Sequence, residues 1–159
     1  MSDKAYIQML IESQEKKLSL LEEALELDEK QLKLIRSENP DLDAIDISLD
    51  RKGKIVEELD KLDDGFESVY AKVRDELKEN KEAHKEEIRK LQELISKITE
   101  LLVKIQAQEL RGNEEVDRFL KNRRNRLKGN KSSVKAANTY ALNMRRVNKI
   151  DSFFVDKKK

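Results

Sequence analysis

The sequence predicts an all-α protein: an elongated antiparallel bundle of three long helices, followed by a basic amphipathic C-terminal helical tail. Charged residues make up 42% of the 159 residues and aromatic residues only 4%, a composition typical of long helices. The chain has four glycines and one proline, and the β-branched and aromatic runs that strands need are missing. Apolar residues instead recur at alternating helical spacings, so side-by-side packing of helices would bury them.

The first helix is expected over residues 3–38, because Ser2 or Asp3 can cap its start and Asn39-Pro40 ends it. Two apolar stripes run along this helix, about 130° apart around its axis. A helix with two apolar stripes is expected to pack against two partners. One stripe contains two polar residues and consists of Ile7, Ile11, Gln14, Leu18, Leu21, Leu25, Asp28, Leu32 and Ile35. The other consists of Tyr6, Leu20, Leu27 and Leu34.

A second helix is expected over residues 41–80 and a third over residues 81–128. Gly53 and Gly65 lie inside the second helix, where they predict a kink or a close approach of another helix. In the third helix, Gly112 interrupts the apolar pattern. The apolar face of the third helix consists of Ile88, Leu91, Ile95, Ile98, Leu102 and Ile105.

Charge divides the chain into two parts, a bundle over residues 1–128 and a basic segment over residues 129–159. Residues 1–120 contain 21 Lys and Arg against 31 Asp and Glu, a net charge of −10. Residues 121–159 contain 13 against 2, a net charge of +11, and predict a helix over residues 133–150 with a flexible end. The two parts are therefore expected to have different roles. A basic patch at their boundary consists of Lys121, Arg123, Arg124, Arg126 and Lys128.

The composition argues against catalysis and against metal or cofactor binding. The chain has no cysteine and one histidine, which excludes disulfides, thiolate sites and histidine clusters. His84 is expected on a solvated helix face, and no catalytic residue, metal site or cofactor is predicted. No window approaches the roughly 18 apolar residues of a membrane span, and no signal peptide is apparent, so a cytoplasmic protein is expected.

Two sets of apolar residues are candidates for binding a partner. The basic tail carries Val134, Tyr140, Met144, Val147, Ile150, Phe153 and Phe154. This face is read as a fourth core helix, a partner-binding helix or a membrane-surface helix. The stripe of Leu20, Leu27 and Leu34 forms a groove for an amphipathic helix if the tail does not cover it. The basic patch favours an acidic protein surface, because no nucleic-acid-binding motif accompanies it.

Several strings of residues resemble the FlgN-type flagellar export chaperones of Gram-positive, clostridia-like bacteria. They are DRKGKIVEELDKLDDGFESVY in the second helix, LQELISKITELLVKIQAQE in the third, and KSSVKAANTYALN and SFFVDKKK in the tail. The resemblance covers nearly the whole chain, including the order and lengths of its segments. Lys52-Gly53, Glu109 and residues 140–159 contribute most to it.

The resemblance implies a cytoplasmic chaperone of the flagellar type III export system that hydrolyses no nucleotide. It implies that the partners are hook-associated proteins of the hook-filament junction, held so that they do not polymerise early, and the export-gate membrane protein that receives them. The C-terminal apolar residues would then contact cargo and gate. Two other functions stay open, a structural homo-oligomeric coiled-coil protein and a nucleic-acid-associated helical protein that uses residues 121–131. Whether the protein is a monomer or a weak dimer also stays open.

Overall fold

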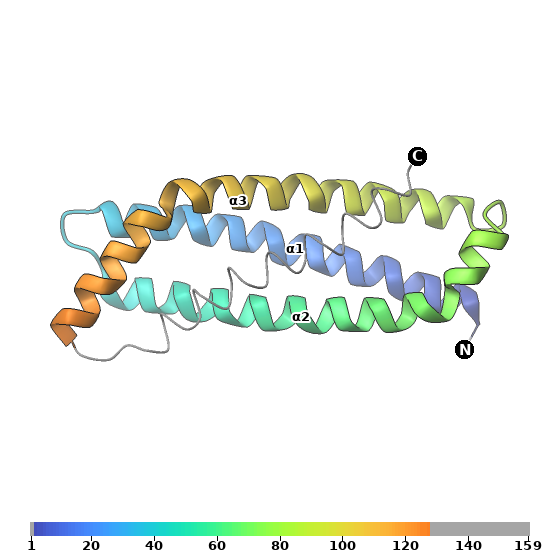
Figure 1. The fold of residues 1–159 in the computed structure, drawn as a ribbon, viewed down its shortest axis with the longest axis horizontal. Coiled ribbons are helices and arrows are strands. Elements are labelled where there is room, and N and C mark those ends of the chain that lie inside the picture. The colour runs from blue at the N-terminus through green and yellow to red at the C-terminus, as the bar shows by residue number, and fades with distance from the viewer. Residues whose placement is uncertain (1, 128–159) are drawn as a thin grey trace.

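The computed structural model describes residues 2–127, and Met1 and residues 128–159 lie outside the described part, together with the side chains of Asn113 and residues 124–127. The described residues form three long helices, α1 (Asp3–Arg36), α2 (Leu42–Glu79) and α3 (Lys85–Leu127). α2 runs opposite to α1, and α3 returns in the direction of α1 (Figure 1). The predicted all-α class is confirmed. The predicted tail helix over residues 133–150 lies outside the described residues.

Short polar side chains start the first two helices. The Ala5 amide donates a hydrogen bond of 3.2 Å to the Ser2 hydroxyl at the start of α1. At the start of α2, the Ala44 amide donates one of 3.1 Å to the Asp41 carboxylate. Both bonds satisfy backbone N–H groups that have no partner inside a first helical turn.

Local hydrogen bonds also explain why two helix ends differ slightly from the sequence prediction. α1 ends at Arg36, because Ser37 adopts an extended backbone and its hydroxyl donates to the Leu34 carbonyl at 2.8 Å. α3 begins at Lys85, since residues 81–84 form a turn in which the His84 amide donates to the Lys81 carbonyl at 3.2 Å. Both connections are therefore short, as antiparallel neighbours require.

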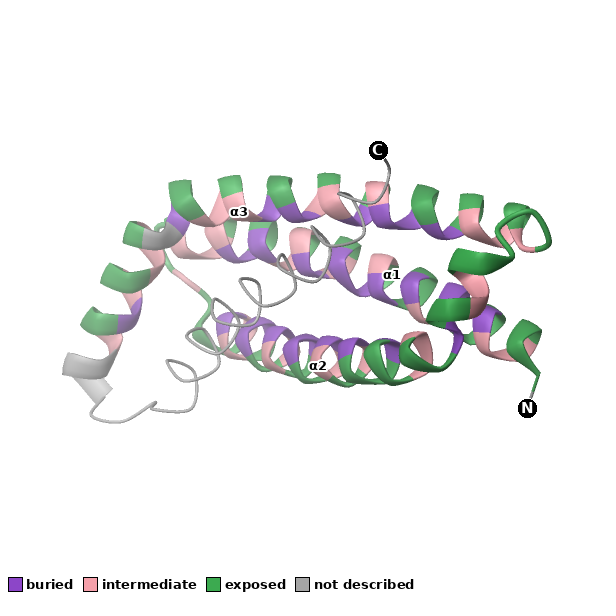
Figure 2. Ribbon diagram, turned by 45° about the vertical axis from the view of Figure 1, so that its right-hand side comes forward, coloured by how far each residue is buried: buried purple, intermediate pink, exposed green. Residues whose placement is uncertain are grey.

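α1 packs against both of the other helices along its length, whereas α2 and α3 pack far less closely on each other. The two apolar stripes of α1 predicted two partners, and this prediction is confirmed. Figure 2 shows the buried side of each helix turned toward its neighbours. The most buried line of α1 lies at the edge of the first stripe that is nearer the second. Four of its residues, Ile7, Gln14, Leu21 and Asp28, belong to the first stripe, and the other four, which lie between the two stripes, are Leu10, Lys17, Ala24 and Gln31.

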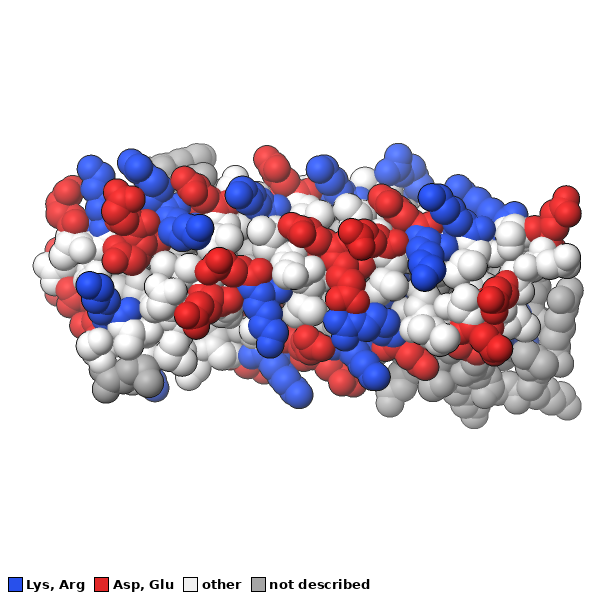
Figure 3. Space-filling view, turned by 180° about the vertical axis from the view of Figure 1, so that it is seen from behind, with Lys and Arg blue, Asp and Glu red and all other residues white. Residues whose placement is uncertain are grey.

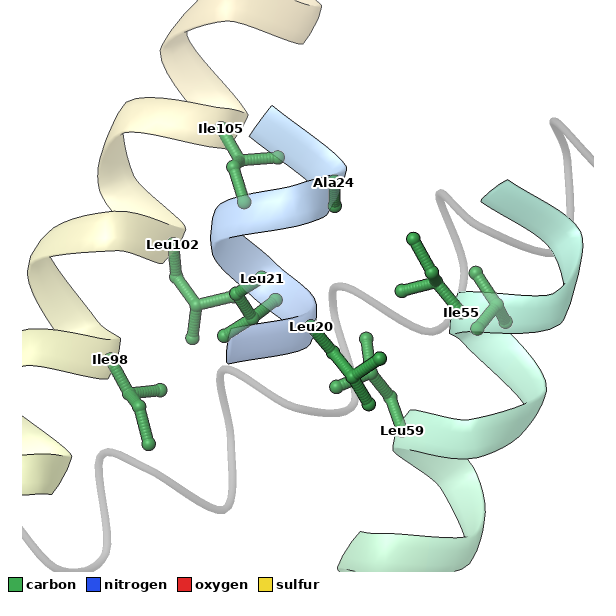
Figure 4. Close-up of a cluster of buried hydrophobic side chains, with 9 residues drawn as sticks. Leu20, Leu21, Ala24, Ile55, Leu59, Ile98, Leu102 and Ile105 are labelled. Carbon is green, nitrogen blue, oxygen red and sulfur yellow. The ribbon is translucent and has the colours of Figure 1, made fainter. Parts of the chain in front are cut away.

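Three clusters of buried apolar side chains hold the helices together. One cluster contains Phe66 and Val73 of α2, and another brings Leu120 of α3 against Ile45 and Leu49 of α2. Burying one Leu or Ile side chain contributes about 1.5–3 kcal/mol. The central cluster draws on all three helices (Figure 4) and consists of Leu20, Leu21, Ala24, Ile55, Val56, Leu59, Ile98, Leu102 and Ile105.

The close helix approach in this fold lies at Gly112. α3 continues unbroken through Gly112, and its last turns cross toward the start of α2 (Figure 1). A Cβ at residue 112 would lie 3.0 Å from Cδ2 of Leu32, so α3 sits directly on α1 here. No atom lies within 4 Å of a Cβ built at Gly65, so no other helix approaches closely at this glycine, and a kink there, the other alternative, stays a prediction. An ion pair also links α1 to α3 nearby, because the guanidinium of Arg36 donates to the carboxylate of Glu115 at 2.8 and 2.9 Å.

Substitutions at these two glycines are expected to change stability in opposite directions. Gly112→Val places a branched side chain against Leu32 and is expected to lower the free energy of unfolding by about 1–3 kcal/mol. Gly65→Ala fills open space in a helix and is expected to raise it by about 0.5–1 kcal/mol. Urea unfolding followed by circular dichroism measures both. Equal stability of Gly112→Val and wild type would show that Leu32 can move aside.

Candidate functional site

A buried ion pair joins α1 to α2. The Lys17 ammonium donates a hydrogen bond of 3.1 Å to Oδ1 of Asp63, and the two side chains are only 1% and 2% exposed. Gln14, one turn earlier on α1, is buried as well. Removing a charge from water costs several kcal/mol unless an opposite charge and hydrogen bonds replace the lost hydration. Each member of this pair therefore helps to offset the lost hydration of the other. We name the pair of Lys17 and Asp63 the first charged layer.

A second charged layer lies further along α1. The ammonium of Lys52 on α2 is 2.5 Å from Oδ1 of Asp28 and donates to Oε1 of Gln31 at 3.1 Å. Asp28 and Gln31 are three residues apart, so both reach Lys52 from one face of α1. Burial raises the pKa of Asp28, and the charge of Lys52 opposes that rise.

Glu109 brings α3 into the second charged layer. Burial, and to a smaller extent the negative charge of Asp28, raise the pKa of Glu109, while the charge of Lys52 lowers it. Together these effects move the pKa of Glu109 from 4.5 to about 7. The charge of Lys52 on α2 thus lowers the pKa of both Asp28 on α1 and Glu109 on α3, at a place where the three helices meet. Because the pKa of Glu109 is near neutrality, its charge changes between mildly acidic and mildly basic solution.

The second apolar stripe of α1 packs against the buried clusters. Leu20 is 6% exposed and faces Leu59 of α2 in the central cluster (Figure 4). Leu27 is half-buried against the same cluster, and Leu34 is half-buried against the cluster around Leu120. An open groove along these leucines is therefore not what the structure shows, because α2 occupies this side of α1. Binding of a foreign helix there stays a prediction.

The structure separates the members of the basic patch. Lys121 is exposed, whereas Arg123 has a side chain only 10% exposed and forms a two-pronged ion pair with Asp46 of α2. The Nη2–Oδ2 distance of this pair is 2.6 Å. Arg123 therefore helps to hold the end of α3 on α2. The side chains of Arg124 and Arg126 lie outside the description, as do Lys128, Val134, Tyr140, Met144, Val147, Ile150, Phe153 and Phe154.

His84 and the other titratable residues form no metal site in the part of the chain that is described. Nε2 of His84 lies 3.4 Å from Oε1 of Glu76, and its side chain is 15% exposed, so it packs at the turn instead of lying on a solvated helix face. Residues 2–127 contain no group of three or more His, Cys, Asp or Glu that could hold a metal ion.

None of the helices described has a stretch long and apolar enough to span a bilayer. Comparisons with models of protein families, with curated proteins and with solved structures found no match to this chain.

Proposed function

We propose that the protein is a cytoplasmic chaperone of the flagellar type III export system. It binds hook-associated proteins of the hook-filament junction, keeps their helical terminal segments from polymerising early and delivers them to the export-gate membrane protein. In this proposal, residues 1–128 are an antiparallel three-helix scaffold. The basic amphipathic segment over residues 133–150, with the aromatic pair Phe153 and Phe154 after it, contacts cargo and gate.

The observation that carries this proposal is the order and length of the helices. Three long helices follow one another with short connections, and this is the organisation that the FlgN-type resemblance implies over nearly the whole chain. The charged layers fit a scaffold of this kind, because buried ion pairs contribute register between helices more than net stability. The ion pair of Arg123 with Asp46 gives this basic residue a structural partner, which argues against a role in contacting nucleic acid.

Binding of a helical cargo segment would be favourable and reversible. An amphipathic segment gains roughly 25 cal/mol for each Å² of apolar surface that leaves water. Ordering the flexible segment offsets a large part of that gain. A moderate affinity follows, and it suits a chaperone that must release its cargo at the export gate.

Capture of a hook-associated protein by the purified full-length chain tests the proposal. We expect capture by wild type and a loss of about tenfold in affinity for the variant that combines Phe153→Ser with Phe154→Ser, because large aromatic anchors dominate such contacts. The matched control is Met9→Ser, which removes an apolar side chain that is 41% exposed on α1. Equal capture by all three proteins would contradict the tail contact. Absence of capture by wild type would contradict the chaperone function itself.

A further inference from the structure

The outer face of α3 carries a regular ladder of charge. Exposed basic residues recur every seven residues, at Lys90, Lys97, Lys104, Arg111 and Arg118. Glutamates stand four residues before all but one of them, at Glu86, Glu93, Glu100 and Glu114. At this spacing a glutamate and a following basic residue attract each other on a helix. In Figure 3, basic and acidic side chains alternate along the upper edge, where α3 runs.

One rung of the ladder is different. Residue 107, four residues before Arg111, is an alanine, so Arg111 alone among these basic residues has no glutamate four residues before it. Glu115, four residues after Arg111, is paired with Arg36. The same place carries large exposed apolar side chains, since Val103 is 58% exposed and Leu110 79%. Val103, Ala107 and Leu110 share one face of the helix, because they are four and three residues apart. We name the set Val103, Lys104, Ala107, Leu110 and Arg111 the Leu110 patch.

The Leu110 patch lies on a fixed stretch of backbone. Leu102 and Ile105, on the opposite side of α3, are fully buried. Just beyond the patch, Gly112 is packed against Leu32 of α1, and Glu115 is held by Arg36. A partner would therefore meet a preformed surface, which lowers the entropy lost on binding.

We propose that the Leu110 patch is a docking site for an acidic amphipathic helix of another protein. Val103 and Leu110 are seven residues apart, about 10 Å along the helix, which matches apolar residues one heptad apart on a partner helix. Lys104 and Arg111 lie along one side of the apolar line and take carboxylates of the partner. The choice of a helical protein segment as occupant rests on the proposed chaperone function.

The charges around the patch favour a single helix over a broad anionic surface. Glu100 and Glu114 stand at the two ends of the patch and are exposed. A membrane of anionic lipid or a nucleic-acid backbone would meet these carboxylates together with the basic residues, and like charges would repel. A narrow helix that crosses the patch places its carboxylates beside Lys104 and Arg111 alone.

A designed peptide tests the proposal with the full-length protein. The probe is a fluorescein-labelled peptide of about four heptads with leucine at the core positions and glutamate at the flanking positions, whose like charges keep it from pairing with itself. Fluorescence anisotropy measures its binding. We expect the variant Leu110→Ser with Arg111→Glu to bind about tenfold more weakly or worse, because an apolar anchor is lost and a charge is reversed.

The matched control combines Met9→Ser with Lys97→Glu. It makes the same changes of polarity and charge, but Met9 is on α1, and Lys97 belongs to a rung that has its glutamate. We expect less than about twofold weakening for this control. A peptide with lysine in place of glutamate is expected not to bind. Equal binding by both variants, equal binding of the lysine peptide or no binding by wild type would overturn the proposal. Binding of phosphatidylserine vesicles by wild type, without binding of the acidic peptide, would also overturn the proposal.

The same variants separate this proposal from the proposed function. If wild type and the Leu110→Ser, Arg111→Glu variant capture a hook-associated protein equally, the patch proposal fails while the chaperone function stands. If the acidic peptide binds at the patch and no hook-associated protein is captured, the chaperone function fails while the patch is a docking site for another helical partner.

Discussion

Replacing Asp63 with alanine is expected to lower the free energy of unfolding by about 3–5 kcal/mol. Asp63 faces Lys17 at 3.1 Å between α1 and α2, where both side chains are almost fully buried. Without the carboxylate, the ammonium of Lys17 loses this ion pair at a position where its side chain is only 1% exposed. The cost is therefore the weaker compensation of a buried charge, in addition to the lost hydrogen bond.

Urea unfolding of two further variants identifies this cause. The double variant Lys17→Met with Asp63→Leu removes both charges and is expected to be at least about as stable as wild type, because apolar residues of similar size can replace a buried pair. Glu115→Ala breaks the pair with Arg36, whose side chain is 58% exposed, and is expected to cost only about 0–1 kcal/mol. If Asp63→Ala were as mild as Glu115→Ala, the other surroundings of Lys17 would compensate its charge without Asp63.

The helical class and the two partners of α1 could be predicted from the sequence because they follow from periodicity within single helices. The spacing of apolar residues depends only on the geometry of a helix. Two stripes on α1 indicated two neighbours, and α1 does pack against both α2 and α3. The start of α2 could also be predicted, because the residue that caps it, Asp41, lies directly before the helix in the sequence.

Only half of the most buried line of α1 could be found in the same way, namely Ile7, Gln14, Leu21 and Asp28 of the first stripe. The sequence pattern emphasised Leu18, Leu25 and Leu32, which are only half-buried in the structure. The line midway between the stripes is buried more deeply, and it contains Lys17 and Gln31. A helix with two partners buries the line between its stripes most completely. The place of Lys17 and Gln31 on that line could therefore have predicted their burial.

The partners of the buried charges lie far away in the sequence. Lys17 pairs with Asp63 across 46 residues, and Arg123 pairs with Asp46 across 77. The periodicity of one helix does not reveal which residues of another helix face it. Arg123 was therefore interpreted as part of a basic patch, and its partner Asp46 could not be predicted. The close approach at Gly112 was missed for the same reason, since it depends on Leu32 of another helix.

Glu109→Gln is expected to remove most of a pH dependence of stability in wild type. The ordinary pKa of a glutamate side chain, which applies to the unfolded chain, is 4.5, whereas the pKa of Glu109 in the folded protein is about 7. Between these values the folded state binds more protons than the unfolded state, so the free energy of unfolding falls as pH rises. Above about pH 7 the folded protein carries the full cost of a buried carboxylate near Asp28, on the order of 2–3 kcal/mol. Glutamine mimics the neutral acid and does not carry this cost.

The measurement is urea unfolding at about pH 4 and about pH 8. Wild type and Glu109→Gln should have similar stability at the lower pH, and the variant should be more stable at the higher pH by the amount given above. Some pH dependence should persist in the variant, because burial also raises the pKa of Asp28 and contributes with the same sign. Glu100→Gln on the exposed face of α3 is the matched control, with the same change of charge and no expected effect beyond about 0.5 kcal/mol. Parallel stability curves for wild type and Glu109→Gln would show that Lys52 and water together stabilise the Glu109 carboxylate fully. The meeting point of the three helices would then not respond to pH.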